Sequence, residues 1–332
     1  MPAAAEARDL GARSARSQRW RSHAFGLEIE GDFPAPGLPP STGRRFGPRT
    51  RIELAAPEEV DRDWPADGAE RLVEEFLGGR TPARTIDRHP RAGYRLYARH
   101  FGLARISREG ANVVCAPPDV APWRWQRFLV GRILPWASLL RGHEVFHASA
   151  VRLGEGAVAV IGPSGAGKTS IAVQLVLRGA GFITDDVLAL ERTGGDVLAH
   201  PGASIASVRP AERDAIPRAS WRGLGTVLGH HEKTYVELPR EAKPWPLRAI
   251  YYLVPGEGSP AGEIAPMAPD PRRLLGSTFV LSVRTPQRLR NQLDVCADLA
   301  RTARTYTATV DPQAGAAILA EAILAHAASE AT

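Results

Sequence analysis

The most regular hydrophobic pattern lies near the middle of the chain. Residues 157–161 form an unbroken apolar run, which predicts a strand that is buried on both faces. After a glycine-rich interval, apolar residues recur at helical spacing over 171–176, and Gly179 stands where a helix end favours a positive φ angle. This part of the chain therefore predicts a strand, a tight loop and a helix in succession.

A second strand precedes this unit. Residues 146–153 lead through a short turn at 154–156 into the apolar run, which predicts an antiparallel hairpin. If Leu153 pairs with Ala157, His147 faces the glycine-rich interval. We therefore expect His147 to lie beside whatever that interval binds.

A third strand follows the predicted helix. Residues 182–184 are apolar or β-branched and are followed at once by Asp185 and Asp186. Because a helix connects this strand with the 157–161 strand, we expect the two strands to be parallel neighbours with a right-handed crossover. Their carboxyl ends would then share the edge at which open α/β sheets bind ligands.

Weaker patterns organise the first part of the chain. Residues 1–22 combine arginines with alanine and serine and lack an apolar segment, so we expect a disordered N-terminal extension and not a secretory signal. Residues 23–118 predict a small β-rich domain with a helical patch near 68–77. Its expected strands include 25–30, 94–97 and 112–115.

The second predicted domain covers 123–332. It begins with a half-buried helix over 123–142, which Pro135 would kink. Thr285 before Pro286 predicts the N-terminus of a long helix, and Asp311 before Pro312 predicts that of the last helix. Further strand-like segments lie at 234–238 and 249–254.

The glycine-rich interval carries the clearest chemistry. Residues 162–169 read Gly-Pro-Ser-Gly-Ala-Gly-Lys-Thr and complete the phosphate-loop pattern G-x-x-x-x-G-K-[ST]. Glycines let backbone N–H groups turn toward phosphate oxygens, and the following helix directs its positive dipole end to the same place. We expect Lys168 to reach the terminal phosphates and the Thr169 hydroxyl to coordinate Mg²⁺.

Composition sharpens this interpretation and excludes others. Only three of the 42 Lys and Arg residues are lysines, and one of them is Lys168. The net charge of +6 is spread along the chain without a basic run interleaved with aromatics, so we expect no nucleic-acid partner. Cys115 and Cys296 lack metal-site spacing and fit a reducing cytoplasm, and no apolar run is long enough to span a membrane.

Several polar residues around the loop have both functional and structural interpretations. Of the two adjacent carboxylates, one would hold Mg²⁺ and the other would accept a proton from an attacking hydroxyl, unless both only form a turn. Arg288 and Arg290, in the first turns of a predicted helix, either stabilise transition-state charge or form a solvated helix face. The turn containing His230, His231 and Lys233 is either solvated or an anion contact.

Four pieces of the chain keep a fixed order and spacing: His147-Ala148, the loop at 162–169, Arg178-Gly179, and Asp185-Asp186. In this arrangement they resemble the HPr kinase/phosphorylase family. The resemblance implies that Asp186 accepts the proton of a target Ser or Thr, that His147 assists, and that Thr169 binds Mg²⁺. Residues 200–210 lack the Arg-Gly-x-Gly segment that the family uses for its reverse reaction, so that reaction stays open. The layout is more similar to the HPr-kinase-like proteins associated with peptide natural products, which include lasso-peptide kinases.

The sequence therefore predicts an α/β protein in which a P-loop HPr-kinase-like domain with a central mixed sheet follows a small β-rich N-terminal domain. The expected function is ATP- and Mg²⁺-dependent phosphoryl transfer to a Ser or Thr hydroxyl of a peptide or small protein in the cytoplasm. A small-molecule P-loop kinase and a non-catalytic nucleotide-binding regulator are the alternatives, and a homo-oligomer stays open.

The predicted site residues fall into three groups. Asp186, His147 and Lys168 are the expected catalytic residues, and Thr169 and Asp185 are the expected metal ligands. The expected nucleotide contacts are Gly162, Pro163, Ser164, Gly165, Ala166, Gly167, Lys168, Thr169 and Ser170.

Overall fold

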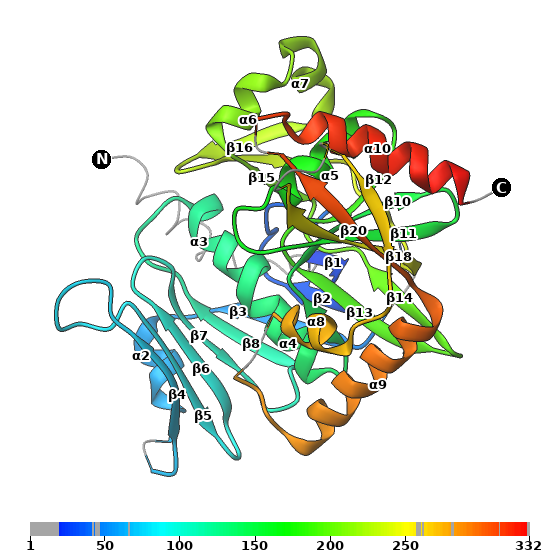
Figure 1. Ribbon diagram of the computed structural model, residues 1–332. Helices are drawn as coiled ribbons and strands as arrows, with labels where there is room; N and C mark the ends of the chain where they lie inside the picture. The colour runs from blue at the N-terminus through cyan, green and yellow to red at the C-terminus, as the bar shows by residue number, and fades with distance from the viewer. Residues whose placement is uncertain are drawn as a thin grey trace.

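A computed structural model describes residues 20–330, except 42, 44–46, 66, 257–259, 261, 280–281 and 312, and gives only the backbone of 218, 222 and 223. The described chain is a mixed α/β structure with sheets of eight, nine and three strands (Figure 1). The helices are α2 (Pro57–Arg62), α3 (Pro122–Phe128), the π-helix η1 (Leu129–Ile133), α4 (Leu134–Leu140), α5 (Lys168–Leu177), α6 (Pro210–Ala215), α7 (Arg218–Leu224), α8 (Pro271–Gly276), α9 (Pro286–Thr302) and α10 (Ala316–Ser329).

The eight-stranded sheet is built from the N-terminal part of the chain in the order β1-β2-β3-β8-β7-β6-β5-β4. Its strands are β1 (Trp20–Ala24), β2 (Leu27–Gly31), β3 (Arg49–Leu54), β4 (Glu70–Glu75), β5 (Arg84–His89), β6 (Gly93–Ala98), β7 (Gly102–Ile106) and β8 (Asn112–Ala116). Residues 1–19 of the expected extension lie outside the described residues, whereas Trp20, Arg21 and Ser22 belong to β1. The prediction of an extension is therefore wrong for residues 20–22, which form part of a strand.

The helical patch expected near 68–77 is wrong, because this segment forms β4. It pairs with β5 in antiparallel register, and the Arg71 guanidinium contacts Asp87 while Arg84 contacts Glu75 across the two strands. Opposite charges on directly paired strands stabilise a hairpin even where the local sequence is rich in helix-forming glutamate.

One helical segment lies between the two large sheets. The expected helix over 123–142 is observed as α3, η1 and α4 in succession, and Pro135 stands in the first turn of α4, where its missing N–H costs little. Buried Ile133 and Trp136 pack with Tyr94 of the N-terminal sheet in one hydrophobic cluster. The same cluster includes Val145 and Ala189 of the second sheet, so the two sheets share a core.

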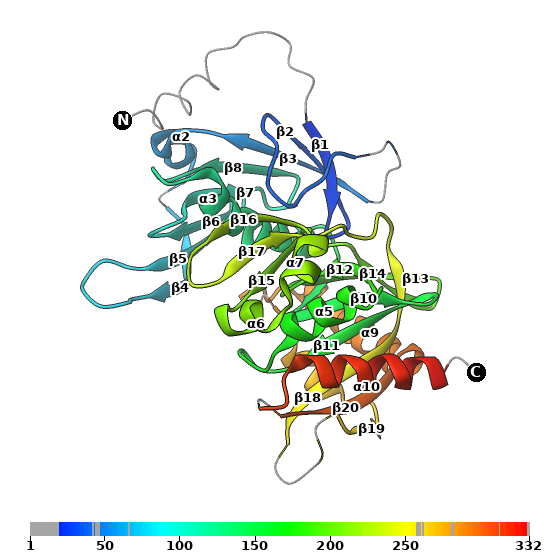
Figure 2. The same cartoon turned by 90° about the horizontal axis from the view of Figure 1, so that it is seen from above.

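The nine-stranded sheet has the order β12-β10-β11-β18-β14-β13-β9, and β18 also pairs with β20, which pairs with β19. Its strands are β9 (Glu144–Phe146), β10 (Ala148–Leu153), β11 (Gly156–Ile161), β12 (Gly181–Thr184), β13 (Leu188–Thr193), β14 (Asp196–His200), β18 (Trp245–Pro255), β19 (Ile264–Met267) and β20 (Arg304–Val310). The hydrophobic core on one of its faces includes residues of α5 and α10, and the core on the other includes residues of α8 and α9 (Figure 2). The sheet is mixed, because β11, β18 and β20 are parallel and the other pairs are antiparallel.

Two sequence predictions about this sheet need correction. The β10–β11 hairpin pairs Leu153 with Gly156, not with Ala157, so its register is shifted by one residue from the expected one. The connection is a two-residue turn in which Gly154 has φ +54°. In addition, β12 runs in the same direction as β11 but is not its neighbour, because β10 lies between them and pairs with both.

The small sheet, in the order β15-β17-β16, lies beside α5 (Figure 2). Its strands are β15 (Ile205–Val208), β16 (Thr226–His230) and β17 (Thr234–Glu237). At the other end of the chain, Thr285 caps α9 as predicted, since its hydroxyl accepts a hydrogen bond from the Arg288 N–H at 3.2 Å. The last helix begins at Ala316, later than the expected Asp311–Pro312 start, and Pro312 lies outside the described residues.

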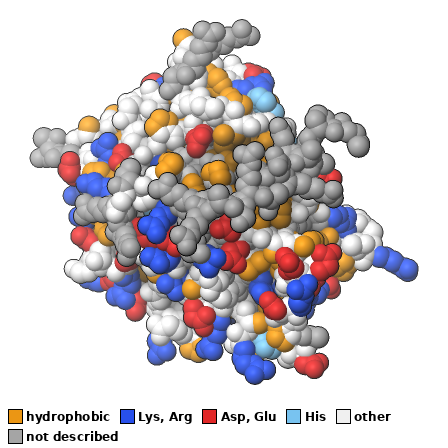
Figure 3. Space-filling view, turned by 180° about the vertical axis from the view of Figure 1, so that it is seen from behind, with side chains coloured by type: hydrophobic (Ala, Val, Ile, Leu, Met, Phe, Trp, Pro, Cys, Tyr) orange, Lys and Arg blue, Asp and Glu red, His pale blue; other side chains and the backbone are white. Residues whose placement is uncertain are grey.

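Two surface properties bear on partners. On the face opposite to that of Figure 1, the visible Lys and Arg side chains are interspersed with Asp and Glu and do not form one basic field (Figure 3). Of the helices that the structure describes, none has the length and apolar character needed to cross a membrane.

Candidate active site at the phosphate loop

The loop at 162–167 connects β11 to α5, as the hydrophobic pattern predicts. Gly165 and Gly167 have φ angles of +89° and +93°, values that side-chain-bearing residues rarely adopt. A Cβ atom on Gly162 would lie 2.9 Å from the Leu253 Cβ of the adjacent strand β18, so this position also requires glycine. Sequence and backbone geometry together specify a tight loop that opens into a helix N-terminus.

Lys168 lies in the first turn of α5 and is buried. Its ammonium donates hydrogen bonds to the carbonyl oxygens of Gly162 at 2.9 Å and Pro163 at 3.1 Å, so it closes the loop on itself. Burial lowers the pKa of Lys168, although the charges of Asp186 and Asp185 act in the opposite direction. A desolvated cation close to two carboxylates is well suited to exchange its carbonyl partners for phosphate oxygens.

Asp185 is held by three protein donors. One carboxylate oxygen accepts hydrogen bonds from the hydroxyls of Ser149 at 2.7 Å and Thr169 at 2.8 Å, and the other accepts the N–H of Ser207 at 3.1 Å. Burial and the neighbouring Asp186 charge raise the pKa of Asp185, and these three hydrogen bonds oppose that rise. The carboxylate is therefore fixed against the Thr169 hydroxyl and points into the protein.

Asp186 has the opposite environment. The Val187 N–H donates to the Asp185 carbonyl at 2.8 Å, which closes a γ-turn around Asp186, whose φ is +68°. This turn directs the Asp186 side chain outward, where it is 60% exposed and lies 2.8 Å from His147 Nε2. Desolvation acts to raise the pKa of Asp186, but the His147 hydrogen bond and the charges of His147, Arg132 and Lys233 lower it overall.

His147 occupies the break between β9 and β10. Its backbone N–H donates to the Ser277 carbonyl at 2.7 Å, and its ring lies 6.2 Å from that of Phe279. The structure places His147 at the Asp186 carboxylate, and the register from which its position was predicted was off by one residue. The structure brings His147 to Asp186 and Thr169 to Asp185.

The site also includes two arginines that the sequence did not single out. Arg209 lies close to the loop, because a Cβ on Gly165 would be 3.2 Å from its guanidinium. The Arg132 guanidinium stacks over Phe279 at 4.6 Å from the ring centroid, and its charge helps to lower the pKa of Asp186. Lys233, which the sequence did single out, acts to lower the pKa of both Lys168 and Asp186. In a chain with 39 arginines among its 42 basic residues, an isolated arginine gives no signal, so Arg209 and Arg132 could not be found from the sequence.

The residues at this edge fit a magnesium-bound nucleotide. Hydroxyl and carboxylate oxygens, as on Thr169 and Asp185, are ligands that Mg²⁺ prefers. Gly167 has open space where a Cβ would stand, and the loop N–H groups lie at the start of α5, which favours phosphate oxygens. The cations Lys168, Arg209 and Lys233 would balance the charge of a triphosphate.

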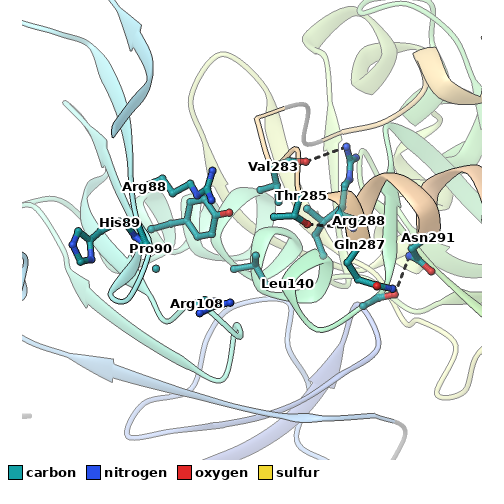
Figure 4. A pocket seen from close by; sticks show the side chains of 14 residues that line it. Arg88, His89, Pro90, Arg108, Leu140, Val283, Thr285, Gln287, Arg288 and Asn291 are labelled. Atoms are coloured by element: carbon teal, nitrogen blue, oxygen red, sulfur yellow. Dashed lines mark hydrogen bonds between the residues drawn. The ribbon is translucent and has the colours of Figure 1, made fainter. Parts of the chain in front are cut away.

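Arg288 is not part of this site. It is buried and its guanidinium pairs with the fully buried Glu144 at 2.8 Å, so neither a transition-state role nor a solvated helix face describes it. Figure 4 shows it with Thr285, the N-cap of α9, and with Gln287 and Asn291 of that helix, across from Arg88 of β5 and Arg108 of the β7–β8 turn. These residues help to line a separate cavity of about 480 Å³. Arg290 is exposed.

The histidines near the turn between β16 and β17 fit the solvated interpretation, and the anion contact stays a prediction. His230 and His231 are exposed, and His231 Nε2 lies 3.2 Å from the Arg124 guanidinium. Lys233 is the member of this turn that acts on the candidate site, through its charge.

Comparisons with known proteins give a structural likeness but no match to a protein family or a curated protein. No protein-family profile matches the chain, and no curated protein matches it. One solved structure, the Hpr(Ser) kinase/phosphatase from Coxiella burnetii, aligns over 57% of this chain and 99% of its own, with 12% identity and a TM-score of 0.31. With an identity and a TM-score this low, the likeness is no evidence for the function of this chain.

Proposed function

We propose that the protein is an ATP- and Mg²⁺-dependent kinase that phosphorylates a Ser or Thr hydroxyl of a peptide or small protein. The observation that carries the proposal is the pair of aspartates behind the phosphate loop. The Asp185 carboxylate accepts a hydrogen bond from the Thr169 hydroxyl at 2.8 Å. The Asp186 carboxylate faces outward, and one of its oxygens lies 2.8 Å from His147 Nε2. One carboxylate is thus set toward a metal ligand and the other toward solvent, from which an acceptor would approach.

Each group has a distinct role in this proposal. Magnesium-bound ATP, when present, supplies an activated phosphoryl group. Lys168 and the loop N–H groups bind and orient the β and γ phosphates, and Thr169 and Asp185 would hold the metal, directly or through water. Arg209 and Lys233 stabilise negative charge on the phosphates.

The acceptor hydroxyl loses its proton to Asp186. Because phosphoryl transfer passes through a loose transition state, the hydroxyl proton leaves late and a weak base suffices. The lowered pKa of Asp186 keeps it ionised near neutral pH, so it is ready to accept that proton. His147 is a positioning residue, because its ring contacts the Asp186 carboxylate and orients it toward the acceptor.

The direct test is transfer of the labelled γ-phosphate of ATP to Ser- and Thr-containing peptides, with and without Mg²⁺. We expect Asp186→Asn to lower transfer by about 10²-fold or more while ATP binding persists. Lys168→Met should remove ATP binding itself, measured as the loss of the thermal shift caused by Mg²⁺ and ATP. Glu155→Gln, in the exposed β10–β11 turn, serves as the matched carboxylate control and should keep both properties.

One outcome would reject the kinase assignment, and a second would reject the role given to Asp186. If wild-type protein binds ATP but transfers nothing to any peptide, protein or metabolite hydroxyl, a nucleotide-binding regulator is the better description. If Asp186→Asn transfers phosphate as fast as wild type, Asp186 is not the base. Transfer to metabolites alone would instead favour a small-molecule kinase on the same loop.

A further inference from the structure

A second group of potential metal ligands lies on the nine-stranded sheet, away from the phosphate loop. Strand pairing sets Glu144 of β9 opposite Leu190 of β13, so the next residue outward, His143, continues toward Glu191. On the other side of β13, Ala189 pairs with His200, which places His200 diagonally from Glu191 on the same face. The register alone therefore gathers His143, Glu191 and His200 from three segments of the chain.

The ligand atoms of these residues are close together. One ligand atom from each side chain lies within 4.8 Å of the other two, and His200 Nε2 is 2.8 Å from a Glu191 carboxylate oxygen. His143 Nδ1 lies 3.3 Å from the Ser138 carbonyl. A carbonyl only accepts, so Nδ1 carries the hydrogen and donates it, which leaves the Nε2 lone pair of His143 available. Such a backbone contact to the far ring nitrogen is typical of metal-binding histidines.

The surroundings are those of a compact internal site with one accessible side. His143 and His200 are 5% and 1% exposed, whereas the Glu191 side chain is 45% exposed and gives an ion access. The β1–β2 turn covers the cluster. A Cβ on Gly26 would lie 2.4 Å from His143 Nε2, so only glycine, here at φ +73°, allows this approach. A cavity of about 10 Å³ between Gly26 and His200 matches the space that one water occupies.

We propose that His143, Glu191 and His200 bind a divalent transition-metal ion, with zinc as the best match to their chemistry. Two imidazoles and a carboxylate suit zinc, and imidazole ligands disfavour Mg²⁺, so this site would not compete for the metal of the phosphate loop. A water would complete four-coordination. For the ion to bind His200 Nε2, the hydrogen that this nitrogen shares with Glu191 must leave it: in a neutral ring it moves to Nδ1, and in a cationic ring it is released to solvent while Nδ1 keeps its own hydrogen.

Such a site would act as a cross-link beneath the N-terminal sheet. Glu191 and His200 come from the second sheet, His143 comes from the loop after α4, and Gly26 packs directly on the His143 ring. Binding to the folded state alone would stabilise the contact between the two sheets. The proposal is independent of the kinase function, because none of its ligands belongs to the phosphate-loop site.

The test uses tag-free, full-length protein that has been stripped with a chelator and dialysed against Zn²⁺ in the presence of excess Mg²⁺. We expect one tightly bound zinc per chain by elemental analysis, and Co²⁺ in its place should give the intense visible absorption of a four-coordinate site. Glu191→Gln should weaken zinc binding by about 100-fold or more, since it removes a direct ligand. The double variant His230→Gln/His231→Gln removes an exposed histidine pair and is the matched control, which should bind zinc as wild type does.

Each alternative result overturns the proposal. Absence of stoichiometric zinc in wild type, equal affinity in Glu191→Gln, or loss of zinc only in the His230/His231 control would show that this cluster is not the site. Circular dichroism checks that Glu191→Gln is folded. If it is not, the Co²⁺ spectrum of wild type decides, because a spectrum of purely octahedral, weak bands contradicts a site with two imidazoles, a carboxylate and one water.

Discussion

The left-handed backbone at Asp186 leads to a quantitative prediction for three substitutions. Among the described residues other than glycine, only Phe25 and Asp186 have positive φ, and the value at Asp186 is +68°. An alanine in this region costs about 1–2 kcal/mol, whereas glycine adopts it freely and asparagine tolerates it. Asp186→Ala, Asp186→Gly and Asp186→Asn all remove the carboxylate charge, so differences in stability among them report mainly on the backbone.

The expected order follows from two opposing contributions. Glycine avoids the strain of about 1–2 kcal/mol but raises the entropy of the unfolded chain, which costs about 0.4–1 kcal/mol relative to alanine. Asp186→Ala should therefore be less stable than Asp186→Gly by about 0.8 kcal/mol, the middle of a range from 0 to about 1.6 kcal/mol. Phosphoryl transfer should be lost in all three variants alike, because none retains a carboxylate at this position.

Urea unfolding at pH 7 without nucleotide, followed by circular dichroism, measures these differences. Glu155 is the matched comparison, since it is exposed, lies in a turn and lacks a positive φ. There, alanine should be more stable than glycine by about 0.4–1 kcal/mol, which is the reverse order. If alanine is at least as stable as glycine at position 186, the strained γ-turn is not a property of the protein in solution.

Three further predictions concern other parts of the fold. Gly165→Ala, at φ +89°, should weaken ATP binding by about tenfold in a calorimetric titration, because the strain falls on the phosphate loop. Arg288→Met should reduce the free energy of unfolding by about 3–5 kcal/mol, because it leaves the buried Glu144 unpaired. Adding Glu144→Gln should recover most of that loss, and a double variant whose two losses simply add would contradict the prediction. Hydrogen bonding by Arg192 lowers the pKa of Asp298, so Asp298→Asn should reduce the free energy of unfolding by about 1 kcal/mol at pH 7. The difference between wild type and variant should disappear as the pH falls through the pKa of Asp298 in the folded protein. A difference in urea unfolding that does not depend on pH would refute the prediction.

The local parts of the site were predictable because they depend on short-range rules. The apolar run before Gly162, the helix after Lys168 and the positive φ of Gly179 each follow from the residues involved, and all are observed. The Thr285 cap is a similar case. Such features need only the chain within a few residues of themselves.

Sheet order and register were predicted less well because they depend on residues far apart in sequence. A turn of two residues instead of three shifts every pair in the β10–β11 hairpin, and nothing in Gly154–Gly156 fixes that length. Likewise, the 157–161 pattern cannot reveal that β10 is inserted between β11 and β12. The Ser149 contact to Asp185 exists only because of this insertion, which explains why the sequence gave no sign of it.

The adjacency of Asp185 and Asp186 in sequence leaves their roles open, and the fold separates them. Asp185 follows β12 directly and, with β10 inserted beside it, receives donors from Ser149 and Thr169, so its oxygens are already engaged. The γ-turn then directs the Asp186 side chain outward, away from that of Asp185. The pKa of Asp186 is lowered, whereas that of Asp185 is raised. Two carboxylates with oppositely shifted pKa values are a recurring sign of divided labour in active sites. Asp185 is half-buried and accepts hydrogen bonds from Ser149, Thr169 and Ser207, whereas Asp186 is exposed, so under the proposed mechanism Asp186 is the carboxylate that meets the acceptor hydroxyl. Exchanging the two roles would require the small sheet and the β10 hairpin to be rebuilt.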